Sequence, residues 1–426
     1  MGWLGLDDTD GLDGGCTTHA MKQIIAILSS ESESRGWSIC DPPQLIRLWP
    51  FASRRTRGNA AVAVEIKCST KKITKDLISR LNELWESLIL VSVKKYGGLS
   101  TSSHNERPQY AASPAMIWTD TRPNEEWYWR CVRSEVSLDD CMELIPLGAT
   151  IWHSNLGHGR IGALAAIAWH GEIDQTWEAI AYREDRNIGK ERQISQSMCA
   201  QLDSKFPETF LNRDPTASRS IIAPRTPCPV LFGIRAESAH AAKEAAEWLT
   251  TGEDCEPISG IQVWRTNQAT DDHIEKVMVT TLTDSVDIRQ QGHSSFTGID
   301  EQKIVAFAQS GPINRTVQSL VEGDQIEYTG LQSPDGSIHL EKLRVIKIAK
   351  KRLLRPLCDC GKRMKSMGNN QGVRCPTCGA RTQVTRSNEL SKPLGFDLGQ
   401  WYEPSPAFRR HLAAPLSRIN LDHPNT

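Results

Sequence analysis

Three carboxylates crowd the loop directly behind the first apolar segment of this chain. Residues 4–6 predict a short strand, and Asp7, Asp8 and Asp10 follow at once. Like charges this close repel one another, so the loop needs a counter-charge. Mg²⁺ is a hard cation that takes one or two carboxylates together with phosphate oxygens. We therefore expect Asp7, Asp8 and Asp10 to hold magnesium and to take part in catalysis.

Glycines and hydroxyls close this loop where a helix is predicted to begin. Gly14, Gly15 and Cys16 lead directly into Thr17 and Thr18. A helix N-terminus presents free N–H groups and the positive end of its dipole, which suits a phosphate. The pattern favours a metal–nucleotide site. An acidic turn with a capping threonine uses the same residue types and remains an alternative.

Size and composition narrow the class of protein. A chain of 426 residues predicts about two to four domains. The net charge of -1 means that any nucleic acid must be held by local basic patches. The mean hydropathy of -0.42, with no apolar run near 20 residues, predicts no membrane span. No signal peptide is visible, and eight of the 12 cysteines are scattered singly, so we expect a cytoplasmic protein.

Apolar spacing predicts two successive α/β segments. The first has helices over residues 17–29 and 73–88 and strands over 45–49, 61–66 and 90–93. With the opening strand, these follow the order β-α-β-β-α-β of a ferredoxin-like unit. The second begins near Gly148, with helices over 159–167 and 239–249, strands over 176–182, 229–235 and 261–265, and a long loop over 204–228. Long loops in compact domains tend to be functional or mobile.

From about residue 273 the helical pattern stops and short β segments follow. Strands are predicted over residues 277–282, 304–308, 325–328 and 339–346, with turns at 323–324 and 333–337. About 75 residues of short antiparallel strands suit a small Greek-key barrel of the OB type. A generic β-sandwich is the alternative.

Four clustered cysteines near the C-terminus predict a metal centre. They are Cys358, Cys360, Cys375 and Cys378. Each pair is followed by a glycine, and four thiolates suit tetrahedral structural Zn²⁺. The first pair has one intervening residue where two are usual, which makes Cys358 the least secure ligand. A redox or disulfide pair is the alternative.

Basic residues gather around these cysteines, in the following tail and in one earlier loop. The candidates for nucleic-acid contact are Lys362, Arg363, Lys365, Arg374, Arg409 and Arg410. Such a density of cations favours binding to a phosphate backbone, with a solvated basic face as the alternative. The earlier loop, residues 54–59, holds Arg57 and Asn59. Its arginines could neutralise a transferred phosphoryl group, grip an RNA phosphate or pair with the carboxylates.

Several motifs in one order along the whole chain resemble the archaeal tRNA-isoleucine 2-agmatinylcytidine synthetases. The matching segments are G-x-D-D-T-D at 5–10, C-T-T at 16–18, T-R-G-N-A-A at 56–61, P-V-L-x-G-I-R at 229–235, T-N-Q-A-T-D-x-H at 266–273, C-G-x-x-M-K-S-x-G at 360–368 and the tail at 409–416.

The resemblance implies a multidomain α+β architecture in four parts. These are an N-terminal kinase-like α/β domain over residues 1–146 that acts on the wobble cytidine, a ferredoxin-like domain over 147–272, an OB-fold barrel over 273–349, and a zinc ribbon with a basic tail over 350–426.

The resemblance also implies a reaction. An ATP-dependent ligase of this family joins agmatine to C2 of the wobble cytidine, position 34, in the minor isoleucine tRNA with anticodon CAU, so that AUA is read as isoleucine. The C2 carbonyl is activated by phosphorylation, AMP is left, and one threonine of the C-T-T motif, Thr17 or Thr18 here, becomes phosphorylated. Asp7, Asp8 and Asp10 would hold Mg²⁺.

Other site residues follow from the same resemblance. We expect the ATP phosphates to meet Gly14, Gly15, Cys16, Arg57 and Asn59, and the basic residues of the ribbon and tail to meet tRNA. The expected cofactors are ATP, Mg²⁺ and structural Zn²⁺, with no membrane or obligate protein partner. A non-catalytic OB-fold and zinc-ribbon nucleic-acid-binding protein is the alternative function.

Overall fold

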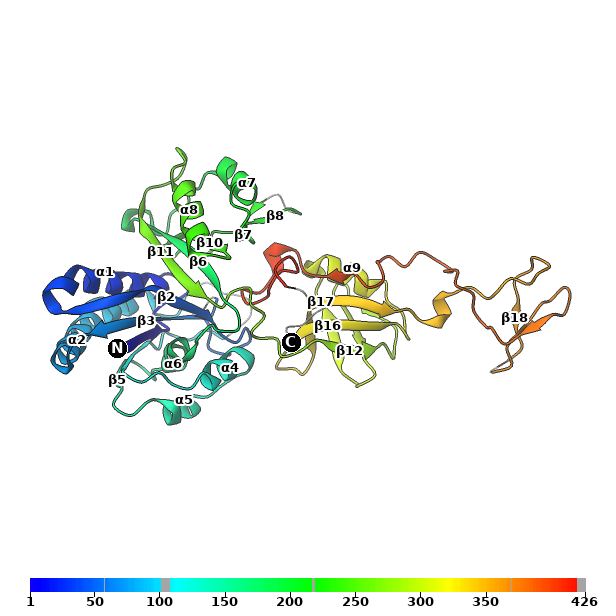
Figure 1. Cartoon of the computed structure of the whole chain (residues 1–426), viewed down its shortest axis with the longest axis horizontal. Coiled ribbons are helices and arrows are strands. Elements are labelled where there is room, and N and C mark those ends of the chain that lie inside the picture. The colour runs from blue at the N-terminus through cyan, green and yellow to red at the C-terminus, as the bar shows by residue number, and fades with distance from the viewer. Residues whose placement is uncertain (57, 101–107, 217–218, 369, 420–426) are drawn as a thin grey trace. The chain divides into compact units, whose positions relative to one another are not determined.

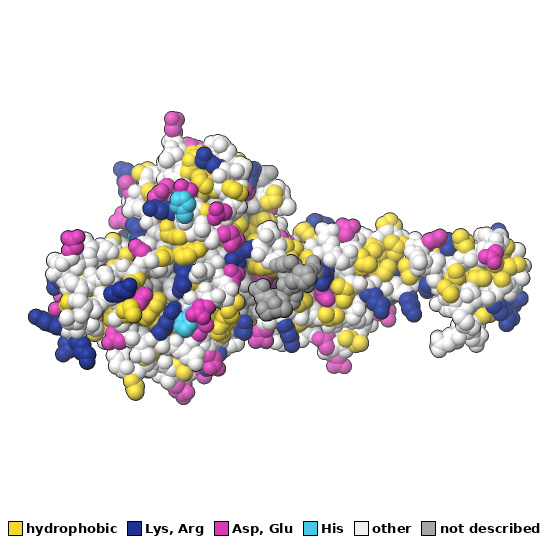
Figure 2. All heavy atoms as spheres, viewed as in Figure 1, with side chains coloured by type: hydrophobic (Ala, Val, Ile, Leu, Met, Phe, Trp, Pro, Cys, Tyr) yellow, Lys and Arg dark blue, Asp and Glu magenta, His cyan; other side chains and the backbone are white. Residues whose placement is uncertain are grey.

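The computed structural model describes residues 1–56, 58–100, 108–216, 219–368 and 370–419. These form two compact units, a first unit of residues 1–275 with 410–419 and a second unit of residues 276–409. Each unit combines strands with helices (Figure 1). No helix in the described part of the chain is long and apolar enough to cross a membrane. Lysines and arginines are interspersed with acidic side chains on the face in Figure 2, in keeping with the net charge of -1.

A single mixed sheet runs through the first unit, in the order β5-β4-β1-β3-β2-β11-β6-β10-β7. Its strands are β1 (Gly2–Asp7), β2 (Trp37–Arg47), β3 (Ala60–Cys68), β4 (Ala115–Thr119), β5 (Thr150–His153), β6 (Thr176–Arg183), β7 (Thr209–Phe210), β10 (Val230–Ala236) and β11 (Ile258–Thr266). The two predicted α/β segments meet where β11 pairs with β2 in parallel, with Arg265 opposite Gln44. Two short strands, β8 (Arg213–Asp214) and β9 (Arg219–Ser220), pair separately.

Helices cover both faces of this sheet. They are α1 (Thr17–Arg35), α2 (Lys71–Leu84), α3 (Leu90–Tyr96), α4 (Glu126–Arg133), α5 (Leu138–Leu144), α6 (Arg160–Ala168), α7 (Gln196–Lys205) and α8 (Ala239–Thr250), with the shorter η1 (Trp85–Ile89) and η2 (Asp185–Asn187). Val62 and Val64 of β3 pack in one core with α1 and α2, and Ala61 and Ala63 pack in another with α4 and α6. Alternate residues of a strand point to opposite faces, so a strand covered on both sides is apolar throughout.

The predicted β-α-β-β-α-β order is present, but its last strand is formed by later residues of the chain than predicted. The strand prediction for residues 90–93 is wrong, because Leu90–Tyr96 is the helix α3, which continues α2 through the π-turn η1. β4, with all five residues buried, pairs with β1 instead. Valine and isoleucine favour strands only where a sheet offers them a packing partner. The first helix is also longer than predicted and ends at Gly36, whose φ of 80° suits glycine.

In the second α/β segment the predicted helices and strands are confirmed as α6, α8, β6, β10 and β11, and α7 was missed. Helix α6 packs on β1 and β3. Residues 410–419 add to the same unit. The backbone N–H groups of Ala269 and Asp271 donate to His411 and Leu412 at 2.8 and 2.9 Å. The Arg418 guanidinium donates to the Asp174 carboxylate at 2.6 and 2.8 Å.

The second unit contains a seven-stranded sheet among its described residues, in the order β12-β16-β17-β15-β14-β13, with β21 on β17. Its strands are β12 (Met278–Thr281), β13 (Asp287–Ile288), β14 (Ser294–Thr297), β15 (Lys303–Ala306), β16 (Gln325–Gln332), β17 (Ile338–Lys347) and β21 (Trp401–Tyr402). The four predicted strands and the turn at 333–337 are confirmed. The expectation that helices stop is wrong at α9 (Pro312–Gln318), whose Ile313 and Val317 complete this core.

Short elements complete the second unit. They are the helical turns η3 (Ala308–Ser310), η4 (Lys350–Arg352) and η5 (Pro406–Phe408) and the three paired strands β18 (Lys365–Ser366), β19 (Val373–Arg374) and β20 (Arg381–Thr382). The three strands belong to the segment that contains the four clustered cysteines.

Close packing of β1 on α6 makes Gly5 a sensitive position. A Cβ added there would lie 2.4 Å from the Ala163 carbonyl oxygen and 3.0 Å from Ile167 Cδ1. We expect Gly5→Ala to lower the free energy of unfolding by about 1–3 kcal/mol, because backbone must move. At Gly98 an added Cβ meets nothing within 4 Å. Gly98→Ala should therefore change stability by less than about 0.5 kcal/mol. Equal melting temperatures for the two variants would contradict the packing described.

Candidate active site and metal centre

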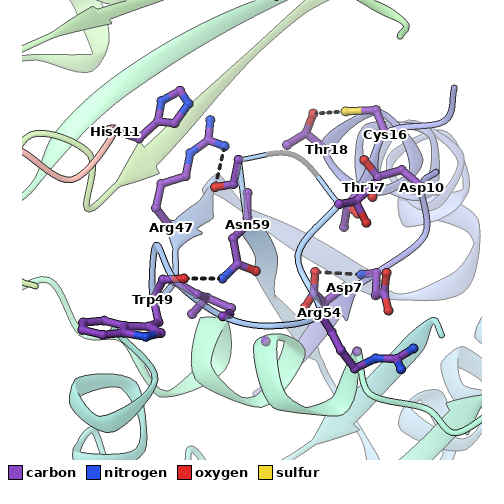
Figure 3. A pocket seen from close by; sticks show the side chains of 18 of the residues that line it. Asp7, Asp10, Cys16, Thr17, Thr18, Arg47, Trp49, Arg54, Asn59 and His411 are labelled. Carbon is purple, nitrogen blue, oxygen red and sulfur yellow. Dashed lines mark hydrogen bonds between the residues drawn. The ribbon is translucent and has the colours of Figure 1, made fainter. Parts of the chain in front are cut away.

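The acidic loop opens into a cavity of about 670 Å³ in the first unit. This volume lies within the range of small-molecule sites, about 300–1,000 Å³. The wall includes the end of β1, the head of α1, the loop between β2 and β3, parts of β6 and β10, and His411. In Figure 3, His411 and Arg47 lie on one side of the pocket, and Asp7, Asp10 and Thr17 lie on the other.

Asp7 and Asp8 are fixed by the backbone at the end of β1. Asp7 Oδ1 accepts from the Asp8 N–H at 2.7 Å, and Asp8 Oδ2 accepts from the Ser113 N–H at 3.0 Å. Asp8 has a φ of 58°, a left-handed conformation that costs free energy and that aspartate tolerates better than most residues. Asp7 also lies against the first turn of α6, where a Cβ on Gly162 would fall 2.0 Å from Asp7 Oδ2.

The carboxylates of this loop are difficult to ionise together. Burial, followed by the charge of Asp8, raises the pKa of Asp7 well above its ordinary value. Burial and the charge of Asp10 raise the pKa of Asp8 to about 7, against the lowering effect of Arg54. Desolvation and like charges both disfavour the ionised form. A divalent cation would relieve this cost for the carboxylates that bind it.

Helix α1 begins with two threonines in different roles. The Thr9 N–H and hydroxyl lie 3.4 and 3.1 Å from Thr17 Oγ1, which ties the acidic loop to the helix. Thr18 Oγ1 lies 3.0 Å from the Cys16 thiol, and Cys16, Thr17 and Thr18 all line the cavity. The alternative of a threonine cap is wrong, because Cys16 holds the cap position and its side chain makes no capping bond.

The remaining predicted phosphate-binding residues divide into three cases. Gly14 and Gly15 are absent from the cavity wall. Gly14 lets the loop approach Tyr96, whose Cδ1 would lie 2.4 Å from an added Cβ, and Gly15 has a φ of 73°. Asn59 lines the cavity, and its amide donates to the Trp49 carbonyl at 2.9 Å. Arg57 lies outside the described residues.

Sequence reasoning missed a polar network on the opposite wall. Glu178 lies between two guanidinium groups, 3.9 Å from Arg47 and 3.8 Å from Arg235. The Gln268 amide nitrogen donates to Glu178 at 2.5 Å, so its carbonyl oxygen faces Arg235 Nε and His411 Nδ1 at 3.2 and 3.1 Å. His411 Nδ1 therefore carries the proton, which leaves Nε2 as an acceptor. The charge of Arg47, enclosure and Arg235 lower the pKa of His411 well below its usual value.

One matched motif organises this wall. Asn267 accepts from the Arg47 N–H at 2.7 Å and donates to the Arg47 carbonyl at 3.0 Å, while Gln268 bridges the network. Asp271 Oδ1 accepts from the Ala414 N–H at 2.7 Å and so holds the tail. The motif at residues 266–273 was recognised in the sequence. Its hydrogen-bond partners could not be predicted, because they lie far away in the chain.

The four clustered cysteines come together as predicted. Their sulfur atoms all lie within 4.8 Å of one another, with Cys358 and Cys378 Sγ 3.3 Å apart and Cys360 and Cys375 Sγ 3.5 Å apart. Hydrogen bonding from the Cys378 backbone lowers the pKa of the Cys375 thiol to about 6, which favours the thiolate that a metal requires. The single intervening residue in the first pair does not keep Cys358 from the cluster, and the set fits tetrahedral Zn²⁺.

The basic residues predicted to contact nucleic acid differ in their exposure and in their partners. Lys365 lies opposite Arg374 across β18 and β19, and both are exposed, as is Lys362. Arg363 pairs with Glu389 at 3.0 Å, and Arg409 pairs with Glu403. The Arg410 guanidinium lies 5.0 Å from the Phe51 ring centre.

Comparison with known proteins identifies the family. Residues 3–150 match the TiaS TCKD domain, residues 157–273 the TiaS FLD domain and residues 355–393 the TiaS C-terminal zinc ribbon domain. The isoleucine-tRNA 2-agmatinylcytidine synthetase TiaS of Methanopyrus kandleri is 30% identical, with 99% of this chain and 98% of the relative covered. The chain belongs to the TiaS family.

Further TiaS proteins support this assignment. The synthetase of Methanosarcina mazei is 31% identical, with 97% of each chain covered. Among solved structures, a tRNA fluorescent labeling enzyme has a TM-score of 0.78 at 28% identity, with 99% of this chain and 98% of that chain covered. A complex of TiaS with an isoleucine tRNA and ATP has a TM-score of 0.76 at 27% identity, with 100% and 99% covered. The predicted multidomain α+β fold with a C-terminal zinc ribbon is thus confirmed, and the ribbon holds the four-cysteine cluster.

The raised pKa of Asp8 predicts a pH-dependent stability. Its folded pKa of about 7 exceeds the 3.8 of an ordinary aspartate. Protonated Asp8 therefore makes its full contribution to the free energy of unfolding below pH about 4. This contribution is lost as the pH rises toward about 7 and the buried carboxyl ionises. In metal-free buffer, the melting temperature of Asp8→Asn should rise relative to wild type between pH 5 and pH 7.5. Asp76→Asn, exposed on α2, is the control. A difference that stays constant with pH would contradict the burial described.

Proposed function

We propose that this protein joins agmatine to C2 of the wobble cytidine in the minor isoleucine tRNA with anticodon CAU, with ATP as the energy source. The observation that carries the proposal is the match of the whole chain to TiaS synthetases together with a cavity that holds the acidic loop and the C-T-T threonines. One related TiaS structure is a complex with an isoleucine tRNA, AMPCPP and agmatine, at a TM-score of 0.73 and 26% identity. A non-catalytic nucleic-acid-binding protein is not favoured.

The chemistry requires activation of a poor leaving group. A cytidine C2 carbonyl oxygen is not displaced by an amine until it is phosphorylated, and agmatine attack at C2 then expels phosphate. Phosphoryl transfer depends chiefly on positioning and charge neutralisation. Asp7, Asp8 and Asp10 would hold Mg²⁺, which would neutralise phosphate oxygens. A carboxylate of this loop that does not bind Mg²⁺ could also accept a proton from the attacking group.

We assign the phosphorylated threonine to Thr18. The Thr17 hydroxyl is committed to the Thr9 N–H and hydroxyl. Both threonines line the cavity, and the Thr18 hydroxyl lies beside the Cys16 thiol at the positive end of α1. Arg47 and Arg235 add positive charge that Glu178 only partly offsets, which suits further phosphate groups of ATP. Gly14 and Gly15 shape the loop, and Cys16 and Asn59 border the phosphates.

We also propose the domain assignments expected from the sequence. Residues 1–146 form the kinase-like domain, 147–272 the ferredoxin-like domain, 273–349 the OB fold, and 350–426 the ribbon and tail. The match to the TiaS TCKD domain ends at residue 150, near the first limit. The match to the TiaS FLD domain ends at residue 273, near the second. The paired strands of the ribbon place Lys365, Arg374 and Arg381 in one cross-strand row, which supports tRNA phosphate binding. Zn²⁺ on the four thiolates would fix these strands.

Incorporation of radiolabelled agmatine into the CAU-anticodon isoleucine tRNA tests the function. Wild type should incorporate label and form AMP only when tRNA and agmatine are both present. Asp8→Ala should reduce incorporation by about 100-fold or more, since charge neutralisation at the transferred phosphoryl group is lost. Its tRNA affinity should stay within about twofold of wild type, because the carboxylate is enclosed in the cavity. A collapse of tRNA binding in this variant would mean that the acidic loop has been misassigned.

The phosphorylated position can be read from the protein itself. After incubation with ATP labelled at the γ-phosphate, peptide mass spectrometry should find phosphate on Thr18. Thr18→Val should abolish the label, because no hydroxyl remains beside Cys16. Thr17→Val should retain label on Thr18 at a reduced level, since the tie to Thr9 is lost. Phosphate on Thr17 in the wild type would contradict the assignment.

A further inference from the structure

Two fully buried hydrogen-bond donors of the first unit have no role in the fold or in the proposed reaction. The side chains of Tyr182 and Trp264 are both 0% exposed. Neither the Tyr182 hydroxyl nor the Trp264 indole nitrogen has a hydrogen-bond partner within the described residues. A buried donor without a partner costs free energy, so each such group in a folded protein needs an explanation. Two of them in one place point to an acceptor that joins them during function.

Sheet register places both donors on the face that also forms the cavity. Trp264 of β11 lies opposite Glu178 of β6, and Tyr182 follows Glu178 by four residues along the same strand. Alternate residues of a strand share a face, so all three side chains project from one side of the sheet. Glu178 and Ile180 line the cavity on this side. Tyr182 and Trp264 belong to the adjoining core, together with Met21 of α1.

The Tyr182 hydroxyl lies beside the threonine that we assign as phosphorylated. Burial, followed by the charge of Cys16, raises the pKa of Tyr182 well above its ordinary value, while the Thr18 hydroxyl and the Trp264 indole lower it. These three groups therefore surround the hydroxyl, although none of them pairs with it at normal hydrogen-bond geometry. Thr18 Oγ1 lies 3.0 Å from Cys16 Sγ on the cavity wall (Figure 3). Both donors thus lie at the head of α1.

Packing holds the Tyr182 ring in this position. The His19 ring lies 5.3 Å from it, centre to centre, and the Lys22 ammonium lies 5.3 Å from its centre. Lys22 Nζ also donates to the Ser259 carbonyl at 3.2 Å, which ties α1 to the strand β11. Burial lowers the pKa of His19 to about 4, so its ring is uncharged at neutral pH. The Tyr182 hydroxyl is therefore fixed between the sheet and α1 and cannot turn toward solvent.

Both unpaired groups are donors, which identifies the missing partner as an acceptor. An indole N–H can only donate, and the raised pKa of Tyr182 keeps its hydroxyl protonated at neutral pH, so this group can donate as well. A phosphate on Thr18 would bring three strong acceptor oxygens to this place. An ammonium group or a base amino group carries donors of its own and would leave both hydrogens unpaired.

We propose that the Tyr182 hydroxyl and the Trp264 indole N–H donate hydrogen bonds to the phosphate carried by Thr18 and hold it at the head of α1. The inference rests on the proposed function in taking Thr18 as the phosphorylated residue. Both side chains orient the phosphate and transfer no proton. They stabilise the phosphorylated protein and stay unpaired in the protein without phosphate.

Melting temperatures with and without phosphate on Thr18 test this contact. Tyr182→Phe removes the hydroxyl and keeps the ring. Without ATP, this variant should melt at the temperature of wild type or above it, because an unpaired buried hydroxyl is removed. After incubation with ATP, with phosphate confirmed by intact mass, it should melt below wild type, because the phosphate loses a donor. Tyr328→Phe, the same change at a buried tyrosine of the second unit, is the control and should differ from wild type equally in both states.

Steady-state agmatine incorporation gives a second reading. We expect kcat of Tyr182→Phe to fall about 10- to 100-fold, the value of one hydrogen bond to a charged acceptor, with KM for tRNA unchanged. An unchanged kcat, with a melting difference that does not depend on phosphate, would overturn the inference and leave the proposed function standing. Wild type that incorporates agmatine with no phosphate on Thr18 would overturn the inference together with the threonine assignment.

The indole resonance of Trp264 distinguishes a phosphate from a buried water as the acceptor. In full-length protein with ¹⁵N-labelled tryptophan, the Trp264 signal is the one missing from Trp264→Phe. Phosphorylation should move this N–H signal downfield in wild type, and Thr18→Val treated with ATP should show no shift. A signal that phosphorylation leaves in place would overturn the inference. Tyr182→Phe preserves the volume of the core, so the melting experiment decides the matter if Trp264→Phe fails to fold.

Discussion

The enclosure of like-charged carboxylates at the head of a helix is the constraint around which the cavity of the first unit is built. Asp7 stands at the end of β1 against the first turn of α6, and Asp8 adopts a left-handed backbone to reach the Ser113 N–H. Burial raises the pKa of both groups. The fold therefore holds this loop in an electrostatically unfavourable state that a bound cation would relieve.

The wall opposite these carboxylates is assembled from parts that lie far apart in the chain. Parallel pairing of β11 with β2 brings Asn267 onto the Arg47 backbone, and Gln268 then joins Glu178, Arg235 and His411. Residues 410–419 reach this wall only because the tail returns to the first unit after the zinc ribbon. The pocket thus unites the two regions that match the TiaS TCKD and FLD domains with the tail. The carboxylates of the acidic loop line one wall of the cavity, and a network that contains the Arg47 and Arg235 guanidinium groups lines the other. We expect an anionic nucleotide to bind between these two walls.

The sequence predicted those parts of the site that are formed by residues close together in the chain. The loop from Asp7 to Thr18 and the four cysteines were visible, because the spacing of a few residues decides their chemistry. The strand at 90–93 was not, since only packing distinguishes α3 from a strand, and β4 takes the place next to β1. Glu178 and His411 could not be predicted, because their positions depend on strand order and on the return of the tail.

The mass of the product nucleoside shows directly whether agmatine is joined to the wobble cytidine. The CAU-anticodon isoleucine tRNA is incubated with the protein, ATP and agmatine, digested to nucleosides and separated by liquid chromatography with mass spectrometry. We expect the wobble cytidine to be replaced by a nucleoside heavier by one agmatine less one water, and we expect omission of ATP or agmatine to abolish this product. Recovery of unmodified cytidine under the complete conditions, from protein that binds the tRNA, would contradict it.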